Sequence, residues 1–389
     1  MSAPDVVILG AGIMGASVAW HLACRGVRRI VLLDRGSAPG AGSTARATGG
    51  FRAQYATDIN VRLSLLARTK LLRFAEDTGV DPGYAPHGYL WLARTQHELA
   101  ALAEARTVQL AAGLMEAAAV SPDEVRRLNP AVAMTGIAGG AWCPTDGFLR
   151  PLSLLTGYLE SAGRLAAEVR WRVEASGLEL GAGGRVTAVR AGAERIACGA
   201  VVNALGAWAG ASGILDNTGF TLPVSPLRRQ VAATVPTDTL PASMPMTIFV
   251  SDGFHLRVRD GRVLLLLPTG GAPGRPFDDS VEPEWVQAVL AKAHARVPVL
   301  RHVPVDPAAC WAGLYEMSPD KHAILGPTPG VPNLFLINGS SGHGVMHAPA
   351  LGQLLSEIVC DGRASALDVR PLRPERFAEH DLNPVSELL

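Results

Sequence analysis

The sequence contains little cysteine, and its five cysteines lie far apart. They are Cys24, Cys143, Cys198, Cys310 and Cys360, without a Cys-x-x-Cys pair or a Cys/His cluster at zinc-ligand spacing. An odd number of scattered cysteines with apolar neighbours indicates reduced, buried thiols rather than a disulfide scaffold. We therefore expect no metal centre and a reducing, cytoplasmic environment.

Net charge and long apolar runs are absent as well. Lys+Arg and Asp+Glu both number 35, so no excess of one sign favours nucleic acid or an anionic membrane as a partner. No apolar run approaches the roughly 18–20 residues of a membrane-spanning helix. A first strand is expected from Val6, so no signal peptide is expected before it.

Hydrophobic residues, in contrast, are plentiful. They make up 48% of the 389 residues, which is ample for a buried core, and the length suggests two or three domains. Helical patterns cover residues 57–78, 95–113 and 284–296, and residues 220–320 are otherwise rich in strands and prolines. The composition therefore predicts a globular protein.

The segment "DVVILGAGIMGASVAWHLACRG" predicts a strand, a glycine turn and a helix, and "RIVLLDRG" predicts a second buried strand. The turn has the spacing G-x-G-x-x-G, which lets the backbone approach a pyrophosphate at a helix N-terminus. Its residues are Gly10, Gly12, Ile13, Met14 and Gly15. Asp34 ends the second strand, where a carboxylate can accept hydrogen bonds from ribose hydroxyls. The pattern predicts FAD or NAD, because a carboxylate disfavours the 2′-phosphate of NADP.

Strand–turn–helix patterns return near residues 150–215 and at the C-terminal end. "ACGAVVNALGAWAG" predicts a strand and tight turn after a β-meander, and "LFLINGSSGHGVMHAPALGQLLSEIV" predicts a strand and a glycine-rich turn before a helix. Segments with this pattern alternate along the chain with segments that lack it. We therefore predict two interleaved domains, one from 1–85, 150–218 and 320–389 and the other from 86–149 and 219–319.

These segments, together with "GSTARATGGFRAQY" and "WAGLYEMSPDKHAILGP", resemble the flavin-dependent amine oxidoreductases of the D-amino acid oxidase superfamily. The resemblance spans nearly the whole chain and is strongest to the sarcosine oxidase, dimethylglycine dehydrogenase and proline dehydrogenase β-subunit group. It implies an α/β (α+β) fold. A glutathione-reductase-like, Rossmann-type FAD-binding domain would be interleaved with a substrate domain built on a large mixed β-sheet.

The resemblance also implies which residues contact FAD. Ser43 and Thr44 would lie at the pyrophosphate, with Arg46 beside them, and residues 48–50 would pass the isoalloxazine, where small residues leave room for a ring. The remaining C-terminal and turn residues would border the cofactor. Besides the first glycine turn, the implied set is Asp34, Arg35, Ser43, Thr44, Arg46, Thr48, Gly49, Gly50, Val173, Ala204, Gly206, Trp208, Gly342, His343, Gly344, Val345 and Met346.

The implied substrate site centres on Arg52, which matches the arginine that binds the substrate carboxylate in sarcosine oxidase-like enzymes. A guanidinium pairs with a carboxylate through two hydrogen bonds and stays charged in a desolvated site. Tyr315 stands where D-amino acid and glycine oxidases tend to have a carboxylate-binding arginine, which favours Arg52 as the anchor. His343 matches a family histidine beside the flavin. The alternatives without a catalytic role are that Arg52 is a solvated or ion-paired loop arginine and that His343 is hydrogen-bonded to the local backbone.

The sequence lacks two residues of monomeric sarcosine oxidases, the one that attaches FAD and the one that activates oxygen. Monomeric sarcosine oxidases attach FAD through a cysteine two residues before the tyrosine matching Tyr315, and here that residue is Gly313, so we predict noncovalent FAD. Their oxygen-activating lysine would fall in "DGFHLRVRDGRVLLLL", which has none. His255, Arg257 or His343 could substitute, so the acceptor is O2 or another electron acceptor.

The leading hypothesis is an FAD-dependent oxidase or dehydrogenase acting on the C–N bond of a small amino acid or N-alkyl amino acid. An apolar pocket around Met317, Trp311 and Phe51 would keep the reacting amine neutral. Two alternatives stay open: a tailoring oxidase acting on a larger amine, and a noncatalytic FAD-binding subunit or assembly factor. The sequence also leaves open whether the protein forms an oligomer.

Overall fold

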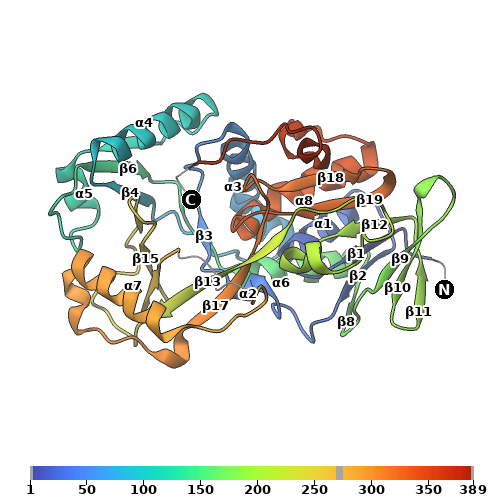
Figure 1. The fold of residues 1–389 in the computed structure, drawn as a ribbon, viewed down its shortest axis with the longest axis horizontal. Coiled ribbons are helices and arrows are strands. Elements are labelled where there is room, and N and C mark those ends of the chain that lie inside the picture. Colours follow the sequence, from blue (N-terminus) through green and yellow to red (C-terminus); the bar gives the residue numbers. More distant parts are fainter. Residues whose placement is uncertain (1–2, 269–274, 387–389) are drawn as a thin grey trace.

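The computed structural model describes residues 3–268 and 275–386 (Figure 1). Residues 1–2, 269–274 and 387–389, which the predicted domain ranges include, lie outside the described residues. The described chain forms two halves, each built on one large sheet. The exact boundaries of the two interleaved domains stay a prediction.

The first sheet has six strands in the order β18-β19-β12-β1-β2-β8, all parallel except β18. The strands are β1 (Val6–Leu9), β2 (Ile30–Asp34), β8 (Ala167–Trp171), β12 (Ala200–Asn203), β18 (Ile324–Thr328) and β19 (Val331–Asn338). All four residues of β1 are buried, as expected for a strand that is covered on both faces. This is the predicted Rossmann-type arrangement.

The two faces of this sheet are covered differently, and the alternation of β1 shows how. Val6 and Ile8 pack against helices, whereas Val7 and Leu9 pack against an antiparallel β-meander. The helices are α1 (Ile13–Cys24), α3 (Asp58–Thr78), α6 (Pro151–Leu165) and α8 (Gly344–Asp361). The meander is β9 (Gly177–Leu180), β10 (Val186–Ala191) and β11 (Glu194–Ala197), at the outer edge of this half (Figure 1).

The second sheet has eight strands in the order β17-β13-β16-β15-β14-β4-β6-β5. The sheet is mixed, because β14 and β4 are parallel while all the other neighbouring strands of the sheet are antiparallel. The strands are β4 (Tyr89–Ala93), β5 (Ala118–Val120), β6 (Gly139–Cys143), β13 (Ser225–Ala233), β14 (Met246–Phe249), β15 (His255–Arg259), β16 (Arg262–Leu266) and β17 (Trp311–Met317). The predicted α/β fold with a large mixed sheet is thus confirmed.

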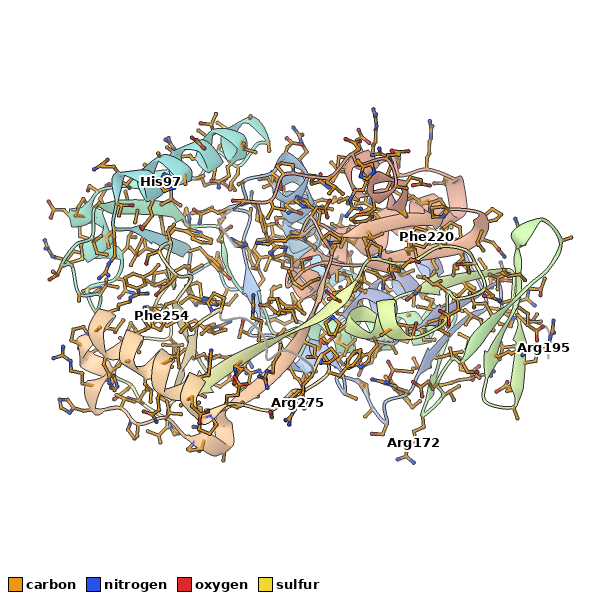
Figure 2. All side chains as sticks on the ribbon, viewed as in Figure 1. His97, Arg172, Arg195, Phe220, Phe254 and Arg275 are labelled. Carbon is orange, nitrogen blue, oxygen red and sulfur yellow. The ribbon has the colours of Figure 1, made fainter. Side chains whose placement is uncertain are left out.

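Helices cover the second sheet on its two faces. Helix α4 (Gln96–Ala111) packs on the face of Tyr89 and Trp91, and α7 (Pro283–Arg296) packs with Leu90 and Leu92 on the other face. The short helix α5 (Pro122–Leu128) joins this second layer. Figure 2 shows Phe254 in the interior of this half, while in the other half Arg195 projects from the outer edge and Arg172 from the lower side. The helices predicted at 57–78, 95–113 and 284–296 are α3, α4 and α7.

The long strands β13 and β17 pair along seven residues and run from one half of the molecule to the other (Figure 1). Near them lie the short helix α2 (Ser43–Arg46) and the two-stranded sheet of β3 (Gly50–Phe51) and β7 (Gly147–Phe148). The predicted glycine-rich segment 42–52 therefore passes between the halves. Among the described helices, none is long and apolar enough to cross a membrane.

Two histidines are buried in the helical layer beside the first sheet. His21 of α1 has Nδ1 2.8 Å from the carbonyl oxygen of Ser17, and His347 of α8 has Nε2 2.9 Å from the hydroxyl of Ser64. Burial lowers the pKa of both imidazoles to about 3. They are therefore neutral in the folded protein at pH 7.

Acid should destabilise the fold through these histidines. Their folded pKa lies below the ordinary 6.5, so the stabilisation is complete above pH 6.5 and is lost as the pH falls toward 3. At pH 5 each contributes a loss of about 2 kcal/mol in the free energy of unfolding. Denaturant unfolding at several pH values between 7.5 and 5 measures this loss of stability. His347→Gln should flatten the pH dependence, the exposed control His97→Gln should not, and equal slopes in all three proteins would contradict the assignment.

Candidate active site

A cavity of about 1180 Å³ lies between the two sheets. The residues predicted to contact FAD lie in the described chain, as do Arg52, His255, Tyr315 and His343, and all of these except Gly15 line this cavity. Gly15 has a packing role instead, since a Cβ there would lie 1.9 Å from the carbonyl oxygen of Gly10. The contact of Gly15 with the cofactor therefore stays a prediction. The G-x-G-x-x-G spacing still predicts the turn correctly.

At one end of the cavity, the carboxylate of Asp34 organises the turn that follows β1. Its Oδ2 accepts a hydrogen bond from the backbone N–H of Ala11 (2.8 Å), and its Oδ1 accepts one from Gly36 (2.7 Å). The two loops that leave β1 and β2 are thus tied together at the carboxyl edge of the parallel sheet, where open α/β sheets bind ligands.

An aromatic and cationic wall lies near this carboxyl edge. The Trp208 ring stacks on Phe277 at 6.3 Å between ring centroids, and the guanidinium carbon of Arg35 lies 4.7 Å from the Trp208 centroid. Val173 donates its backbone N–H to the carbonyl of Asp34 (2.9 Å). These contacts bring three separate predicted segments together at one end of the cavity.

Helix α2 brings its hydroxyls to the N-terminus of α1. The Oγ1 of Thr44 accepts a hydrogen bond from the backbone N–H of Ile13 (3.1 Å). The buried hydroxyl of Ser43 has no hydrogen-bond partner within residues 3–268 and 275–386. Gly12 caps α1 without a side-chain hydrogen bond, and the first turn of α1 has no acidic residue. This end of the cavity is therefore rich in donors and suited to an anion such as a pyrophosphate.

Residues 48–50 line the middle of the cavity, and packing inside the protein also constrains the two glycines. A Cβ at Gly49 would lie 2.3 Å from the carbonyl oxygen of Leu149, and a Cβ at Gly50 would lie 2.0 Å from the Tyr89 hydroxyl. Packing within the protein thus demands glycine here, whatever the cavity holds. Arg257 donates to the carbonyls of Thr48 (2.8 Å) and Gly49 (3.2 Å). It does not line the cavity, so its predicted substitution for an oxygen-activating lysine has no support.

The backbone at the end of β3 directs Arg52, the residue after the strand, into the cavity and Phe51 away from it. Successive side chains of an extended segment point to opposite sides. Phe51 is fully buried and packs edge-on against Tyr84, with ring centroids 5.4 Å apart, so its predicted place in the substrate pocket was incorrect. The guanidinium carbon of Arg52 lies 4.2 Å from the Tyr55 ring centroid and 5.1 Å from that of Trp91. Arg52 is only 5% exposed.

His343 contacts the Arg52 guanidinium directly. Its Nε2 lies 3.4 Å from Nη2 of Arg52. An arginine has only donors, so this Nε2 is the acceptor and the proton of the neutral ring sits on Nδ1. Burial first, and then the charge of Arg52, hold the pKa of His343 well below its usual range. The histidine therefore orients Arg52 as a neutral acceptor.

Asp146 fixes the backbone immediately after Arg52. Its fully buried carboxylate accepts hydrogen bonds from the N–H of Ala53 (2.7 Å) and from the backbone N–H (3.4 Å) and side-chain amide (3.1 Å) of Gln54. Burial raises the pKa of Asp146 to about 6. No local sequence pattern marks Asp146, because it lies 94 positions away from Arg52 in a separate turn.

The second sheet supplies the opposite wall. Tyr315 and Met317 of β17 and His255 of β15 line the cavity, whereas Trp311 does not. Trp311 donates its indole N–H to the carbonyl of Arg46 (2.8 Å), so its predicted place in the apolar pocket was incorrect. Burial lowers the pKa of His255 to about 4 and raises the pKa of Tyr315. Both side chains are therefore uncharged at pH 7.

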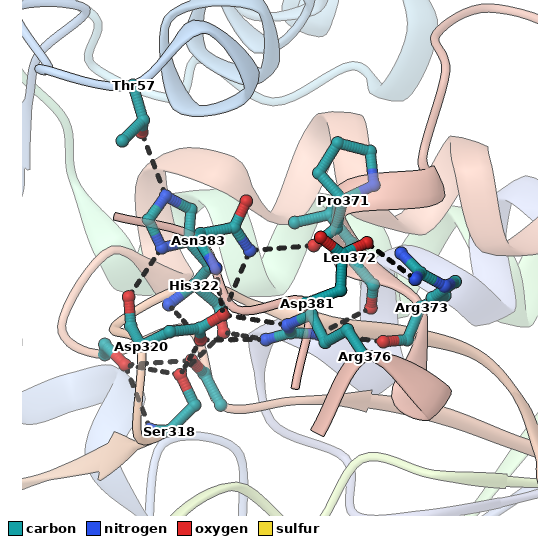
Figure 3. A network of polar contacts seen from close by, with 12 residues as sticks. Thr57, Ser318, Asp320, His322, Pro371, Leu372, Arg373, Arg376, Asp381 and Asn383 are labelled. Atoms are coloured by element: carbon teal, nitrogen blue, oxygen red, sulfur yellow. Dashed lines mark hydrogen bonds and ion pairs between the residues drawn. The ribbon is translucent and has the colours of Figure 1, made fainter. Parts of the chain in front are cut away.

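A buried network holds the turn that brings Lys321 to the cavity (Figure 3). The carboxylate of Asp320 accepts hydrogen bonds from Nε (2.8 Å) and Nη2 (3.0 Å) of Arg376, and from the side chain of Asn383 (3.0 Å). His322 Nε2 lies 2.9 Å from the hydroxyl of Thr57. The network joins the C-terminal segment to the start of α3. It fixes the turn in which Lys321 has a positive φ of 60°.

Several lining residues were missed by the sequence reasoning. They are Tyr89, Trp91, Arg229, Met246, Ile248, Leu266, Glu316 and Lys321. Alternation along β4 places Tyr89 and Trp91 on one face, but the sequence does not show that this face meets a cavity. No group of three or more His, Cys, Asp or Glu residues within the described chain could hold a metal ion.

Comparison with known proteins identifies the family of the chain. The sequence profile of the DAO family, described as FAD dependent oxidoreductase, matches residues 5–358. The chain belongs to this family. The resemblance inferred from the sequence is thereby confirmed, and FAD is the cofactor of this oxidoreductase.

Individual relatives cover almost the whole chain. FAD-dependent oxidoreductase domain-containing protein 1 of Bos taurus is 28% identical over 414 residues, which are 96% of this chain and 84% of that protein. Glycine oxidase of Geobacillus kaustophilus (strain HTA426) is 28% identical over 377 residues, or 94% and 95%. The crystal structure of L-proline dehydrogenase from P. horikoshii superposes with a TM-score of 0.90 at 25% identity, covering 98% and 100%.

The residues of the cavity fit FAD. The buried Ser43 hydroxyl and the start of α1, which has no acidic residue in its first turn, offer donors where a pyrophosphate would be held. Asp34 offers carboxylate oxygens to a ribose from the end of β2. None of the five cysteines lines the cavity.

Thr44→Val should weaken FAD binding while keeping the side-chain shape. Thr44 lines the cavity beside the start of α1, so the change removes a hydroxyl that can donate to the pyrophosphate, and a hydrogen bond to a charged group contributes about 1.5–3 kcal/mol. We expect a loss of about tenfold or more in FAD affinity, measured by fluorescence titration of the apoprotein. Thr69→Val is the matched control, since the exposed Thr69 hydroxyl donates only within α3, to the Leu65 carbonyl. Equal affinities for the Thr44 and Thr69 variants would refute the role of Thr44.

Proposed function

We propose that this FAD-dependent oxidoreductase oxidises the C–N bond of a small amino acid or N-alkyl amino acid. The observation that carries the proposal is the buried Arg52 guanidinium, directed into the cavity and contacted by a neutral histidine. The names of the relatives support the same substrate class, since they include a glycine oxidase and an L-proline dehydrogenase.

Arg52 binds the substrate carboxylate in this proposal. A guanidinium offers two parallel N–H donors that match a carboxylate, and it keeps its charge when water is excluded. Its direction is limited by Tyr55, Trp91 and His343, which surround it at the distances given above. Holding the acid group at one point orients the rest of a small substrate, which is how a binding residue contributes to rate.

The amine end of the substrate meets side chains that carry no charge. An amine must be neutral to lose hydride, because a proton occupies the lone pair that stabilises the forming iminium. A carboxylate beside the nitrogen would favour the ammonium form. His255 and Tyr315 are uncharged in the cavity. The protein thus favours the reactive neutral amine.

When bound, FAD would supply the oxidant, accepting a hydride (one proton with two electrons) from the carbon of the CH–N unit. The nitrogen lone pair forms the C=N bond as the C–H bond breaks, and the iminium then loses its N–H proton to solvent. Water adds to the imine carbon, the C–N bond breaks, and the products are an oxo acid and an amine or ammonia. We propose O2 or another electron acceptor as the second substrate.

Arg52→Ala should remove the preference for substrates that carry an acid group. We expect a loss of about 100-fold in the second-order rate of anaerobic FAD reduction by amino acids, from the loss of a charge-assisted pair. The same amino acids as neutral amides should lose much less. Stopped-flow absorbance at the flavin band measures both rates.

The control for this experiment is Arg62→Ala, which removes an exposed arginine that pairs with Asp58 at the start of α3. It should leave both rates unchanged. An equal loss for the acids and the amides in Arg52→Ala would show that Arg52 does not bind the carboxylate. Failure of every amino acid tested to reduce the wild-type flavin would rule out the proposed activity.

We also propose that FAD is bound noncovalently. The position of the flavin-attaching cysteine of monomeric sarcosine oxidases is Gly313, and the thiol of Cys310 donates to the carbonyl of Asp306 (3.3 Å) away from the cavity. Acid precipitation of the holoprotein should therefore release all the yellow colour into the supernatant. A yellow pellet would contradict this.

A further inference from the structure

A second arginine reaches the substrate cavity from the opposite wall. Arg229 lies in β13 and lines the cavity, and its guanidinium carbon is 5.7 Å from the Tyr315 ring centroid. Its neighbour Arg228 lies on the other side of the strand and pairs there with Asp278 (3.0 Å) and with Glu282. Two adjacent arginines thus face opposite ways, and Arg229 is the one that reaches the cavity.

The sheet register separates Arg229 from Arg52. Four cavity residues form a row across neighbouring strands, with Trp91 paired to Ile248, Ile248 to His255, and His255 to Leu266. Arg52 lies 5.1 Å from the Trp91 ring at the β4 end of this row. Arg229 belongs to β13, the strand beyond β16 at the other end. Neighbouring strands are roughly 4.8 Å apart, so the backbones that frame the row at β4 and β13 are about 19 Å apart.

Both guanidiniums act on the same space in the middle of the row. After burial, the charges of Arg52 and Arg229 are the two influences that lower the pKa of His255, and both also act on Tyr315. The half-buried Lys321 adds a third cation to the cavity lining. A low-dielectric cavity with several fixed positive charges favours a ligand with more than one negative charge.

We infer that the substrate carries two acid groups, with Arg52 binding the α-carboxylate and Arg229 binding the second one. The substrate class is then a dicarboxylic amino acid or an N-carboxyalkyl amino acid whose C–N unit lies over the His255–Leu266 part of the row. This inference rests on the proposed function, because it assigns the second end of the same substrate. The guanidinium fork suits a second carboxylate for the same geometric reason as Arg52.

Redox-inert carboxylates test the inference on the FAD-loaded protein. Binding is followed through the change in the flavin absorbance spectrum for succinate against butyrate and for glutarate against pentanoate, pairs matched in chain length. The wild type should bind each dicarboxylate at least tenfold more tightly than its partner. Arg229→Leu should lose this preference, losing tenfold or more for the dicarboxylates and much less for the monocarboxylates.

Two further variants separate charge from folding. Arg229→Lys keeps the charge and should retain part of the preference, and monocarboxylate binding retained in Arg229→Leu shows that this variant is folded. Arg363→Leu removes an exposed arginine beyond the end of α8 and should change neither affinity. Equal affinities for the mono- and dicarboxylates in the wild type, or an equal loss for both in Arg229→Leu, would overturn the inference.

The outcome also distinguishes this inference from the proposed function. If monocarboxylic amino acids reduce the flavin and a second acid group gives no gain in rate or affinity, the inference is wrong and the amino acid oxidation stands. If no carboxylate binds and no amino acid of either class reduces the flavin, both are wrong. If N-carboxymethyl amino acids reduce the wild-type flavin at least tenfold faster than their N-methyl counterparts, and Arg229→Leu removes the difference, the inference is supported.

Discussion

The contact between a permanently charged guanidinium and a neutral imidazole is the interaction on which the proposed chemistry depends. Arg52 keeps its charge in a buried position, while burial and that same charge keep His343 neutral. The imidazole can therefore accept a hydrogen bond from the arginine and limit its orientation. A charged histidine there would repel the arginine and disturb the site that we assign to the substrate carboxylate.

The fold supports this contact from several distant segments. Arg52 follows β3, His343 caps the start of α8, and Asp146 fixes the loop that leaves Arg52. The Asp320–Arg376 pair holds the turn near His343 from the C-terminal segment. Because these parts are more than a hundred residues apart in most cases, the site forms only when the two sheets are packed together. The cavity and the fold are thus one cooperative unit, and changes in the second half should be felt at Arg52.

Local sequence signals predicted the parts of the site that depend on local structure. Strand–glycine turn–helix spacing located residues 10–15 and Asp34, and the resemblance located Arg52 and His343 on the cavity. Side-chain direction was harder to predict: Phe51 and Trp311 are apolar and near the site, yet strand alternation and the bond to Arg46 turn them away. Arg229 and Lys321 carry no local signal, because only the packing of β13 and of the 318–322 turn brings them to the cavity.

A double-mutant cycle between Arg52 and His343 tests the central claim most directly. Butyrate affinity would be measured for the FAD-loaded wild type, Arg52→Lys, His343→Phe and the double variant. If the histidine acts by orienting the arginine, the two effects are coupled by about 1–3 kcal/mol, and the double variant is little worse than Arg52→Lys alone. Additive losses would mean that His343 and Arg52 act independently, and the account of a neutral histidine positioning a buried cation would be wrong.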